Sequence, residues 1–93
     1  MLKISASQGV ETQLIAFVST ADTEATFAGG CKGFFLSATA DVLVDFDQPT
    51  DTGSFLVKAN IAYPFFDFSN TNVQKVHAKG SSGSGNLHII GVR

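Results

Sequence analysis

The acidic side chains in the middle of the sequence are its densest group of potential metal ligands, and carboxylate oxygens are ligands that Ca²⁺ prefers. They are Asp41, Asp45, Asp47 and Asp51. A calcium loop of the EF-hand type also needs a central Gly and a closing Glu, whereas here Pro49 interrupts the run and no Glu closes it. The alternation of Asp45 and Asp47 with Val44 and Phe46 is typical of a strand with one face in water. We therefore expect solvated carboxylates and no cofactor, with an opportunistic calcium site as the alternative.

Histidine and cysteine offer little further chemistry. His77 and His88 could face each other across a hairpin, but two imidazoles alone make a weak site because zinc takes four ligands. His77 alternates in phase with Lys75 and Lys79, so we expect its side chain to be exposed. Cys31 is the only cysteine, which excludes an intramolecular disulfide and predicts a partly buried structural thiol. We expect no metal site.

One short motif resembles a catalytic signature. Asp51-Thr52-Gly53-Ser54 resembles the Asp-Thr/Ser-Gly motif of aspartic proteases, and Ile89-Ile90-Gly91 resembles the second hydrophobic-Gly element of the retroviral type. Such an enzyme would be a dimer in which two Asp carboxylates share a proton. That Asp must end a buried apolar strand, but Gln48-Pro49-Thr50 precedes it here and has loop composition. A turn between two strands explains the motif, so we expect no enzyme, and a dimeric protease is the last alternative.

The elements that must position these residues are short β-strands. Runs rich in Val, Ile, Phe and Thr are separated by Gly, Pro, Asp and Asn, and no segment has a sustained helical period. The Gly80–Gly85 segment, rich in Gly and Ser, leads into a strand rather than a helix, which predicts a mobile hairpin connection. The fold we predict is all-β: one domain over 1–93, an antiparallel β-sandwich (jelly-roll-like) or a barrel of about eight strands. The expected strands cover residues 2–6, 13–19, 25–27, 33–38, 42–47, 54–58, 63–68, 75–79 and 87–92.

Composition narrows the classes of partner. The chain has 93 residues, a net charge of −2 and only 15% charged residues, against about 25% in ordinary globular proteins. This charge argues against binding to nucleic acid or anionic membranes. The longest apolar run, from Leu14 to Val18, is too short for a signal peptide or a membrane span, so we expect a protein made in a cytoplasm. The scarcity of charge predicts a surface that other protein chains cover.

Aromatic residues point to where that contact lies. The chain has nine Phe, one Tyr and no Trp, and the densest group runs from Tyr63 to Phe68. In a strand, Phe66 and Phe68 would face one side and Tyr63 and Phe65 the other. One set would fill the core and leave the other for a partner. The predicted interface residues are Leu2, Ile4, Tyr63, Phe65, Phe66 and Phe68.

Three segments resemble small all-β virion proteins of tailed bacteriophages. They are residues 30–36 (Gly-Cys-Lys-Gly-Phe-Phe-Leu), 40–46 (Ala-Asp-Val-Leu-Val-Asp-Phe), and the region from Val76 to Gly91. The resemblance spans about residues 30–92. It implies a head decoration or cement protein, or another minor virion component, made in the host bacterial cytoplasm. Its partners would be further copies of itself, a trimer being one candidate, and a major capsid or other virion protein.

A binding module is the alternative from another class. A small β-sandwich that binds carbohydrate would need exposed aromatic rings beside acidic side chains. Tyr63 with Asp67, or the run from Asp41 to Asp51, could supply them.

Overall fold

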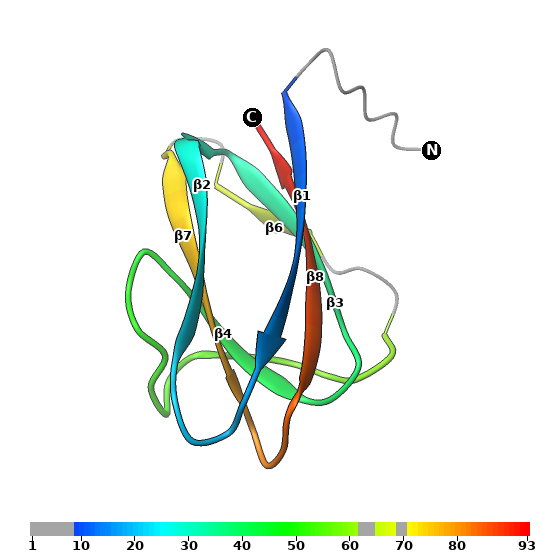
Figure 1. The fold of residues 1–93 in the computed structure, drawn as a ribbon. Coiled ribbons are helices and arrows are strands. Elements are labelled where there is room, and N and C mark those ends of the chain that lie inside the picture. The colour runs from blue at the N-terminus through cyan, green and yellow to red at the C-terminus, as the bar shows by residue number, and fades with distance from the viewer. Residues whose placement is uncertain (1–8, 62–64, 69–70) are drawn as a thin grey trace.

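The fold consists of two β-sheets packed face to face (Figure 1). The computed structural model describes residues 9–61, 65–68 and 71–93. These residues form eight strands, and none of them belongs to a helix able to span a membrane. The strands are β1 (Val10–Phe17), β2 (Thr23–Cys31), β3 (Gly33–Ala38), β4 (Val42–Phe46), β5 (Phe55–Val57), β6 (Phe65–Asp67), β7 (Val73–Gly80) and β8 (Gly85–Val92).

The strand order explains how the chain builds both sheets. One sheet has the order β1-β8-β3-β6 and the other β2-β7-β4-β5. Every pair is antiparallel, and β1 pairs with β8, β2 with β7, β3 with β6 and β4 with β5. The described strands are thus paired like those of one long antiparallel hairpin that has been rolled up. Rolling adds two further pairings, β3 with β8 and β4 with β7. This is a jelly-roll sandwich. The predicted all-β sandwich is confirmed, because the described strands form two separate sheets and not the alternative barrel.

The last two strands correct one prediction. We expected residues 80–85 to close a hairpin, but β7 and β8 lie in different sheets and residues 81–84 pass between them. Main-chain hydrogen bonds anchor this connection, from Gly80 N to Val18 O (2.9 Å) and from Ser81 N to Asp41 O (3.0 Å). A Cβ at Gly80 would overlap the Gly83 carbonyl, so glycine is required there. His77 and His88 therefore do not face each other.

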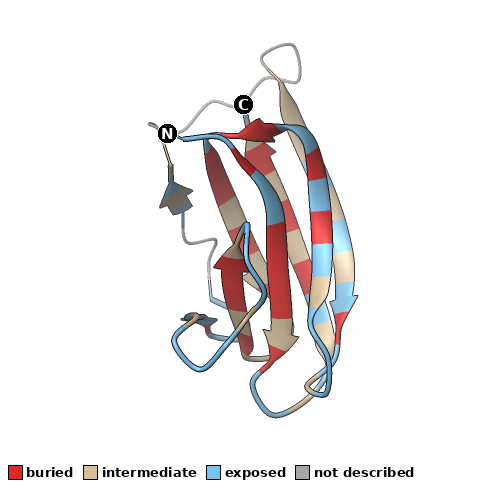
Figure 2. Ribbon diagram, turned by 90° about the vertical axis from the view of Figure 1, so that its left-hand side faces the viewer, coloured by how far each residue is buried: buried red, intermediate tan, exposed pale blue. Residues whose placement is uncertain are grey.

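The core lies between the sheets and is dominated by aromatic rings. Figure 2 shows buried and exposed positions alternating along the strands, as the pleat of a sheet requires. Phe34 packs edge-on against Phe27, with centroids 5.2 Å apart, and stacks on Phe46 at 5.7 Å. Val44, which alternates with Asp45, is fully buried as that alternation predicts, and so is Val42.

Strand β2 departs from regular geometry at its end. Gly29 and Gly30 have φ values of 80° and 79°, which favour glycine, and the register with β7 shifts between Thr26 and Cys31. The bulge delivers Cys31 to the core, where it is completely buried rather than partly buried as expected. Burial raises the pKa of its thiol, which disfavours the reactive thiolate.

Candidate functional site

The outer face of the first sheet is the broadest uncharged surface formed by the described strands. The strand registers place Thr12, Ile90, Phe35 and Phe65 in one row across all four strands. Outward positions in neighbouring rows are also mostly apolar or uncharged. We call this surface the neutral face: Val10, Thr12, Leu14, Ala16, Phe35, Ser37, Phe65, Asp67, Asn86, His88, Ile90 and Val92.

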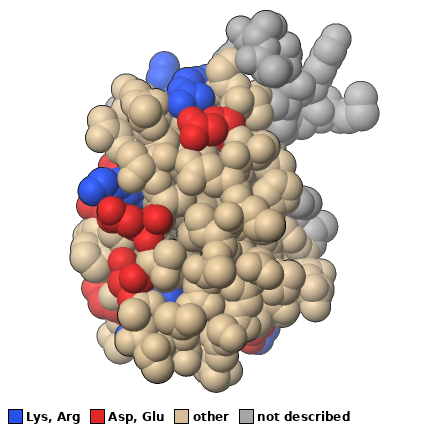
Figure 3. Space-filling view, viewed as in Figure 1, with Lys and Arg blue, Asp and Glu red and all other residues tan. Residues whose placement is uncertain are grey.

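Charge is nearly absent from the neutral face. Asp67, on the edge strand β6, is its one formally charged member, and His88 is its one histidine. Leu14 is 69% exposed and Phe65 is 48% exposed. In Figure 3 the acidic and basic atoms gather along the β2–β7 side and near both ends of the molecule, while most of the surface over β8 and β3 is free of them. A surface of this kind is typical of protein–protein contact.

The edge formed by the short strands β5 and β6 adds a group of aromatic rings. Phe66 lies with its centroid 5.2 Å from that of Phe46 and 5.4 Å from that of Phe55. Phe55 is 54% exposed, whereas Phe66 and Phe68 are partly buried against the core. The predicted alternation is therefore confirmed: Phe66 and Phe68 turn inward and Phe65 outward. We call Phe55, Phe65 and Phe66 the aromatic edge.

The remaining predicted interface residues are not placed. Leu2, Ile4 and Tyr63 lie outside the described residues. Of the three that are described, Phe65 offers the largest outward surface. It also packs against Phe35 of the neutral face, with ring centroids 4.6 Å apart, so the aromatic edge and the neutral face are continuous.

The opposite edge of the sandwich is closed by polar contacts. Gln13 Nε2 donates to Thr26 O (2.7 Å), and Arg93 Nη2 donates to Glu11 Oε1 (2.6 Å) and to Ala28 O (2.9 Å). Hydrogen bonds from Arg93 and Gln13 hold the pKa of Glu11 below its ordinary value. These contacts join the long edge strands β1 and β2 across the two sheets.

The outer face of the second sheet has a contrasting composition. We call it the charged face: Glu24, Thr26, Leu43, Asp45, Leu56, Lys75, His77 and Lys79. The registers place Glu24, His77 and Asp45 in one row over β2, β7 and β4. Acidic, basic and imidazole groups therefore alternate on neighbouring strands.

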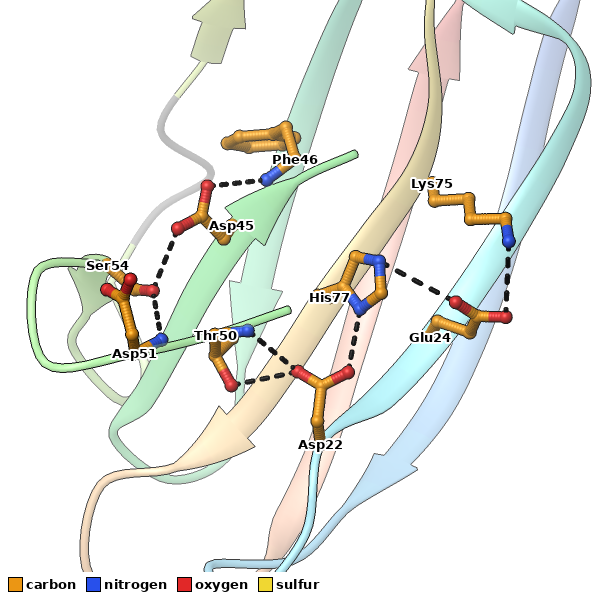
Figure 4. Close-up of polar contacts among 9 residues, drawn as sticks. All are labelled: Asp22, Glu24, Asp45, Phe46, Thr50, Asp51, Ser54, Lys75 and His77. Carbon is orange, nitrogen blue, oxygen red and sulfur yellow. Dashed lines mark hydrogen bonds and ion pairs between the residues drawn. The ribbon is translucent and has the colours of Figure 1, made fainter. Parts of the chain in front are cut away.

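His77 is at the centre of a polar cluster (Figure 4). The cluster holds together the connection between β1 and β2 and the connection between β4 and β5. His77 Nδ1 lies 2.7 Å from Asp22 Oδ2, and because a carboxylate only accepts, Nδ1 carries the proton. Thr50 donates its main-chain N–H (3.0 Å) and its hydroxyl (2.8 Å) to the other oxygen of Asp22. His77 Nε2 lies 3.6 Å from Glu24 Oε2. The expectation that His77 is exposed is wrong, since its exposed fraction is 6%.

This cluster does not have the arrangement of a hydrolytic triad. The Thr50 hydroxyl donates to Asp22 and not to the imidazole, and Nε2 of His77 faces a carboxylate where a triad would have its nucleophile. Burial by itself would raise the pKa of Asp22. Hydrogen bonds from Thr50 and His77 outweigh it and hold that pKa below its ordinary value. Asp22 therefore stabilises the loops in its ionised form.

Asp45 corrects the expectation of a solvated carboxylate. Its side chain is only 8% exposed. Oδ1 accepts from Phe46 N (2.9 Å) and Gln48 Nε2 (3.0 Å), and Oδ2 accepts from Ser54 Oγ (2.9 Å). Figure 4 shows this carboxylate directed toward the segment that follows β4. Asp45 thus holds that segment in place.

The other members of the acidic run serve loops in the same way. Asp41 Oδ1 accepts from Ala59 N (2.8 Å), and Asp47 Oδ1 accepts from Gln74 N (3.0 Å) and Lys75 N (2.8 Å). No group of three or more His, Cys, Asp or Glu residues within the described segments could hold a metal ion. Main-chain N–H groups thus donate to one oxygen, Oδ1, of both Asp41 and Asp47.

The Asp51-Thr52-Gly53-Ser54 motif forms the predicted turn. Ser54 N donates to Asp51 O (3.2 Å), and Gly53 N donates to Asp51 Oδ1 (2.8 Å). Asp51 is exposed and belongs to the connection between β4 and β5. It does not follow a buried apolar strand, which is the position that an aspartic protease requires.

A shallow pocket of about 250 Å³ opens beside this turn. Its lining combines hydroxyl groups with one basic, one acidic and one aliphatic side chain. The lining residues are Ser19, Leu43, Thr50, Asp51, Thr52, Lys79, Gly80 and Ser81.

Sequence reasoning did not identify the neutral face as a unit. The signal was present in Thr12, Leu14 and Ala16, which alternate along β1 without a charge on their outward side. The pairing of β8 with both β1 and β3 was needed to bring this stripe beside Ile90 and Phe35.

No known protein-family model matches the sequence, and no curated protein is significantly similar to it.

Proposed function

We propose that the protein is a non-enzymatic structural subunit of a bacteriophage particle, either a head decoration or cement protein or another minor virion component. The observation that carries the proposal is the neutral face, a four-stranded surface with one charge at its margin. Covering such a face removes apolar area from water at about 25 cal/mol per Å² and desolvates few charges. The partners are further copies of the chain and a major capsid or other virion protein.

The bacteriophage setting rests on the resemblance of residues 30–36, 40–46 and 76–91. These segments contribute to β3, β4, β7 and β8, the inner strands of the two sheets, and include the last two residues of the edge strand β2. Jelly-roll sandwiches occur in viral capsids, and also in lectins and other proteins, so the fold supports the proposal only by analogy. The protein would be made in the bacterial cytoplasm and would then join the virion, without contact to nucleic acid or membrane.

Co-assembly with a capsid tests this function. The chain is produced together with the major capsid protein encoded nearest to it in its genome, and particles are separated on a density gradient. We expect many copies of the chain to migrate with the particles, and cryo-electron microscopy to show added density on them. A chain that stays at the top of the gradient beside well-formed particles would contradict the proposal.

The pocket beside the Asp51 turn favours a second candidate, a carbohydrate-binding module. Hydroxyl groups together with Lys79 and Asp51 can bond sugar hydroxyls, and Leu43 can contact the apolar side of a sugar ring. A glycan array followed by NMR titration tests this candidate. Binding that disappears in Lys79→Ala would favour it, and a blank array would remove it.

A further inference from the structure

We infer that the neutral face packs against the same face of a second copy of this chain, forming a two-fold symmetric dimer. This inference deepens the proposed function, because it names the partner of the surface on which that function rests. Three features of the molecule support this dimer: the distribution of charge, the geometry of the sheets and the area of the face.

The distribution of charge indicates which surface of a second copy can cover the neutral face. A head-to-tail contact would press the neutral face against the charged face and bury Glu24, Lys75 and Lys79 beneath apolar groups. Removing these charges from water carries a desolvation penalty, which the Lys75–Glu24 pair at 3.6 Å offsets only in part. The neutral face brings only Asp67, which lies at one corner on the short strand β6. Of the two outer faces, only the neutral face therefore suits itself as partner.

Sheet geometry allows this contact. Two twisted antiparallel sheets can pack face to face at about 10 Å with their strands roughly 30° apart. The projecting side chains of the neutral face are of the types that fill such a layer, with Leu14 and Ile90 beside the paired rings of Phe35 and Phe65. The same patch on both copies produces a closed pair and not an open chain.

The area of the neutral face determines how strong a dimer we expect. Four strands spaced about 4.8 Å apart, with a rise of about 3.3 Å per residue, give a flat area on the order of 400 Å². Side chains standing on this area expose more, so two faces together approach the lower bound of about 1,200 Å² for specific interfaces. We therefore expect a dimer that dissociates on dilution. It would leave the charged face exposed.

A pair of matched substitutions tests the dimer. Leu14 and Leu56 are both exposed leucines on the outward side of an edge strand, Leu14 on β1 in the neutral face and Leu56 on β5 in the charged face. Sedimentation velocity over a range of concentrations measures the dissociation constant of the wild type, Leu14→Lys and Leu56→Lys. Circular dichroism confirms that each variant is folded.

We expect the wild type to dimerise, Leu14→Lys to raise the dissociation constant by about 10-fold to 100-fold, and Leu56→Lys to leave it within about 3-fold. Ile90→Lys, in the middle of the face, should act like Leu14→Lys. A wild type that stays monomeric up to millimolar concentration would overturn the inference, and so would a dimer that only Leu56→Lys or Phe55→Lys disrupts.

The outcomes separate this inference from the proposed function. A monomer that still migrates with capsid particles would overturn the dimer and leave the virion function standing. A dimer broken by Leu14→Lys that never joins particles would support the inference and contradict the virion function.

Discussion

The two outer faces of this sandwich have the same construction and opposite chemistry. Each consists of four antiparallel strands. A long strand lies at one edge with a second long strand beside it, and a three-residue strand lies at the other edge. On the charged face, His77 and Asp45 are nearly buried, because Asp22 and the segment after β4 lie against them. On the neutral face, Leu14 and Phe65 remain exposed. On the charged face, ionisable side chains hold the chain's own loops. The neutral face has few such side chains, and its exposed apolar residues are the basis of the dimer that we propose.

The largest effect on stability should come from Asp45→Ala on the charged face. The substitution leaves Phe46 N, Gln48 and Ser54 without their shared acceptor in a nearly buried position. We expect a loss of about 2–3 kcal/mol in the free energy of unfolding. In a domain of this size that corresponds to a melting temperature lower by roughly 10–20 °C, measured by circular dichroism.

Asp67→Ala is the matched control for that prediction. Asp67 is an exposed aspartate at the corner of the neutral face. Its substitution should change the free energy of unfolding by no more than about 0.5 kcal/mol. Equal losses for the two variants would mean that the faces do not differ in the way we describe.

Asp22→Asn should give the second-largest effect, and one that depends on pH. The folded protein holds the pKa of Asp22 below its ordinary value, so the ionised carboxylate stabilises the fold above the unfolded pKa of about 3.9. This contribution disappears as pH falls through the lower, folded pKa. At pH 7 we expect Asp22→Asn to lose about 1–2 kcal/mol.

Chemical denaturation of both proteins between pH 7 and pH 3 measures this dependence. The difference between wild type and Asp22→Asn should shrink as pH falls below about 4. A difference that stays constant over this range would show that Asp22 acts through shape and not through charge.

Phe65→Ala should have a smaller effect on the isolated subunit. Its ring pairs with Phe35 at 4.6 Å but is 48% exposed, so we expect a loss of about 0.5–1 kcal/mol in the free energy of unfolding. Thermal unfolding at a concentration below the dimer's dissociation constant checks this value. A loss above about 3 kcal/mol would place Phe65 in the subunit's own core.

Lys75→Gln should have the smallest effect. Lys75 Nζ lies 3.6 Å from Glu24 Oε1, and both side chains are 46% exposed, so water and salt screen the pair. We expect a change of no more than about 0.5 kcal/mol, which disappears in 1 M NaCl. A larger change that persists in salt would mean that the charged face is held by ion pairs across its strands.

The strands could be predicted from the sequence because each carries its own pattern. Val44 and Phe46 alternate with Asp45, and Val76 and Ala78 alternate with polar residues. The sandwich follows from several such strands. The partners of β8 could not be predicted, because nothing local to residues 85–92 indicates pairing with β1 and β3. The hairpin that we expected at Gly80–Gly85 was wrong for this reason.

The errors on the candidate site have the same origin. Alternation correctly directs His77 and Asp45 away from the core, but it does not indicate whether a loop then covers the outward face. Asp22 is 55 residues from His77 in the chain, and it reaches the imidazole only because β2 and β7 are paired. Phe65 and Phe66 were assigned to opposite sides correctly because that distinction depends only on the two-residue period of a strand.

The pairing of β1 with β8 has a consequence for how the chain reaches its folded state. Val10 lies opposite Val92, so the first described strand cannot find its partner until the last one has left the ribosome. Such distant pairing slows folding, because the entropy of closing a long loop is lost before contacts offset it. In the meantime β1 has an open backbone edge and Leu14 is exposed, which is a hazard for aggregation. We expect the yield of soluble protein to depend on the rate of translation and on chaperones.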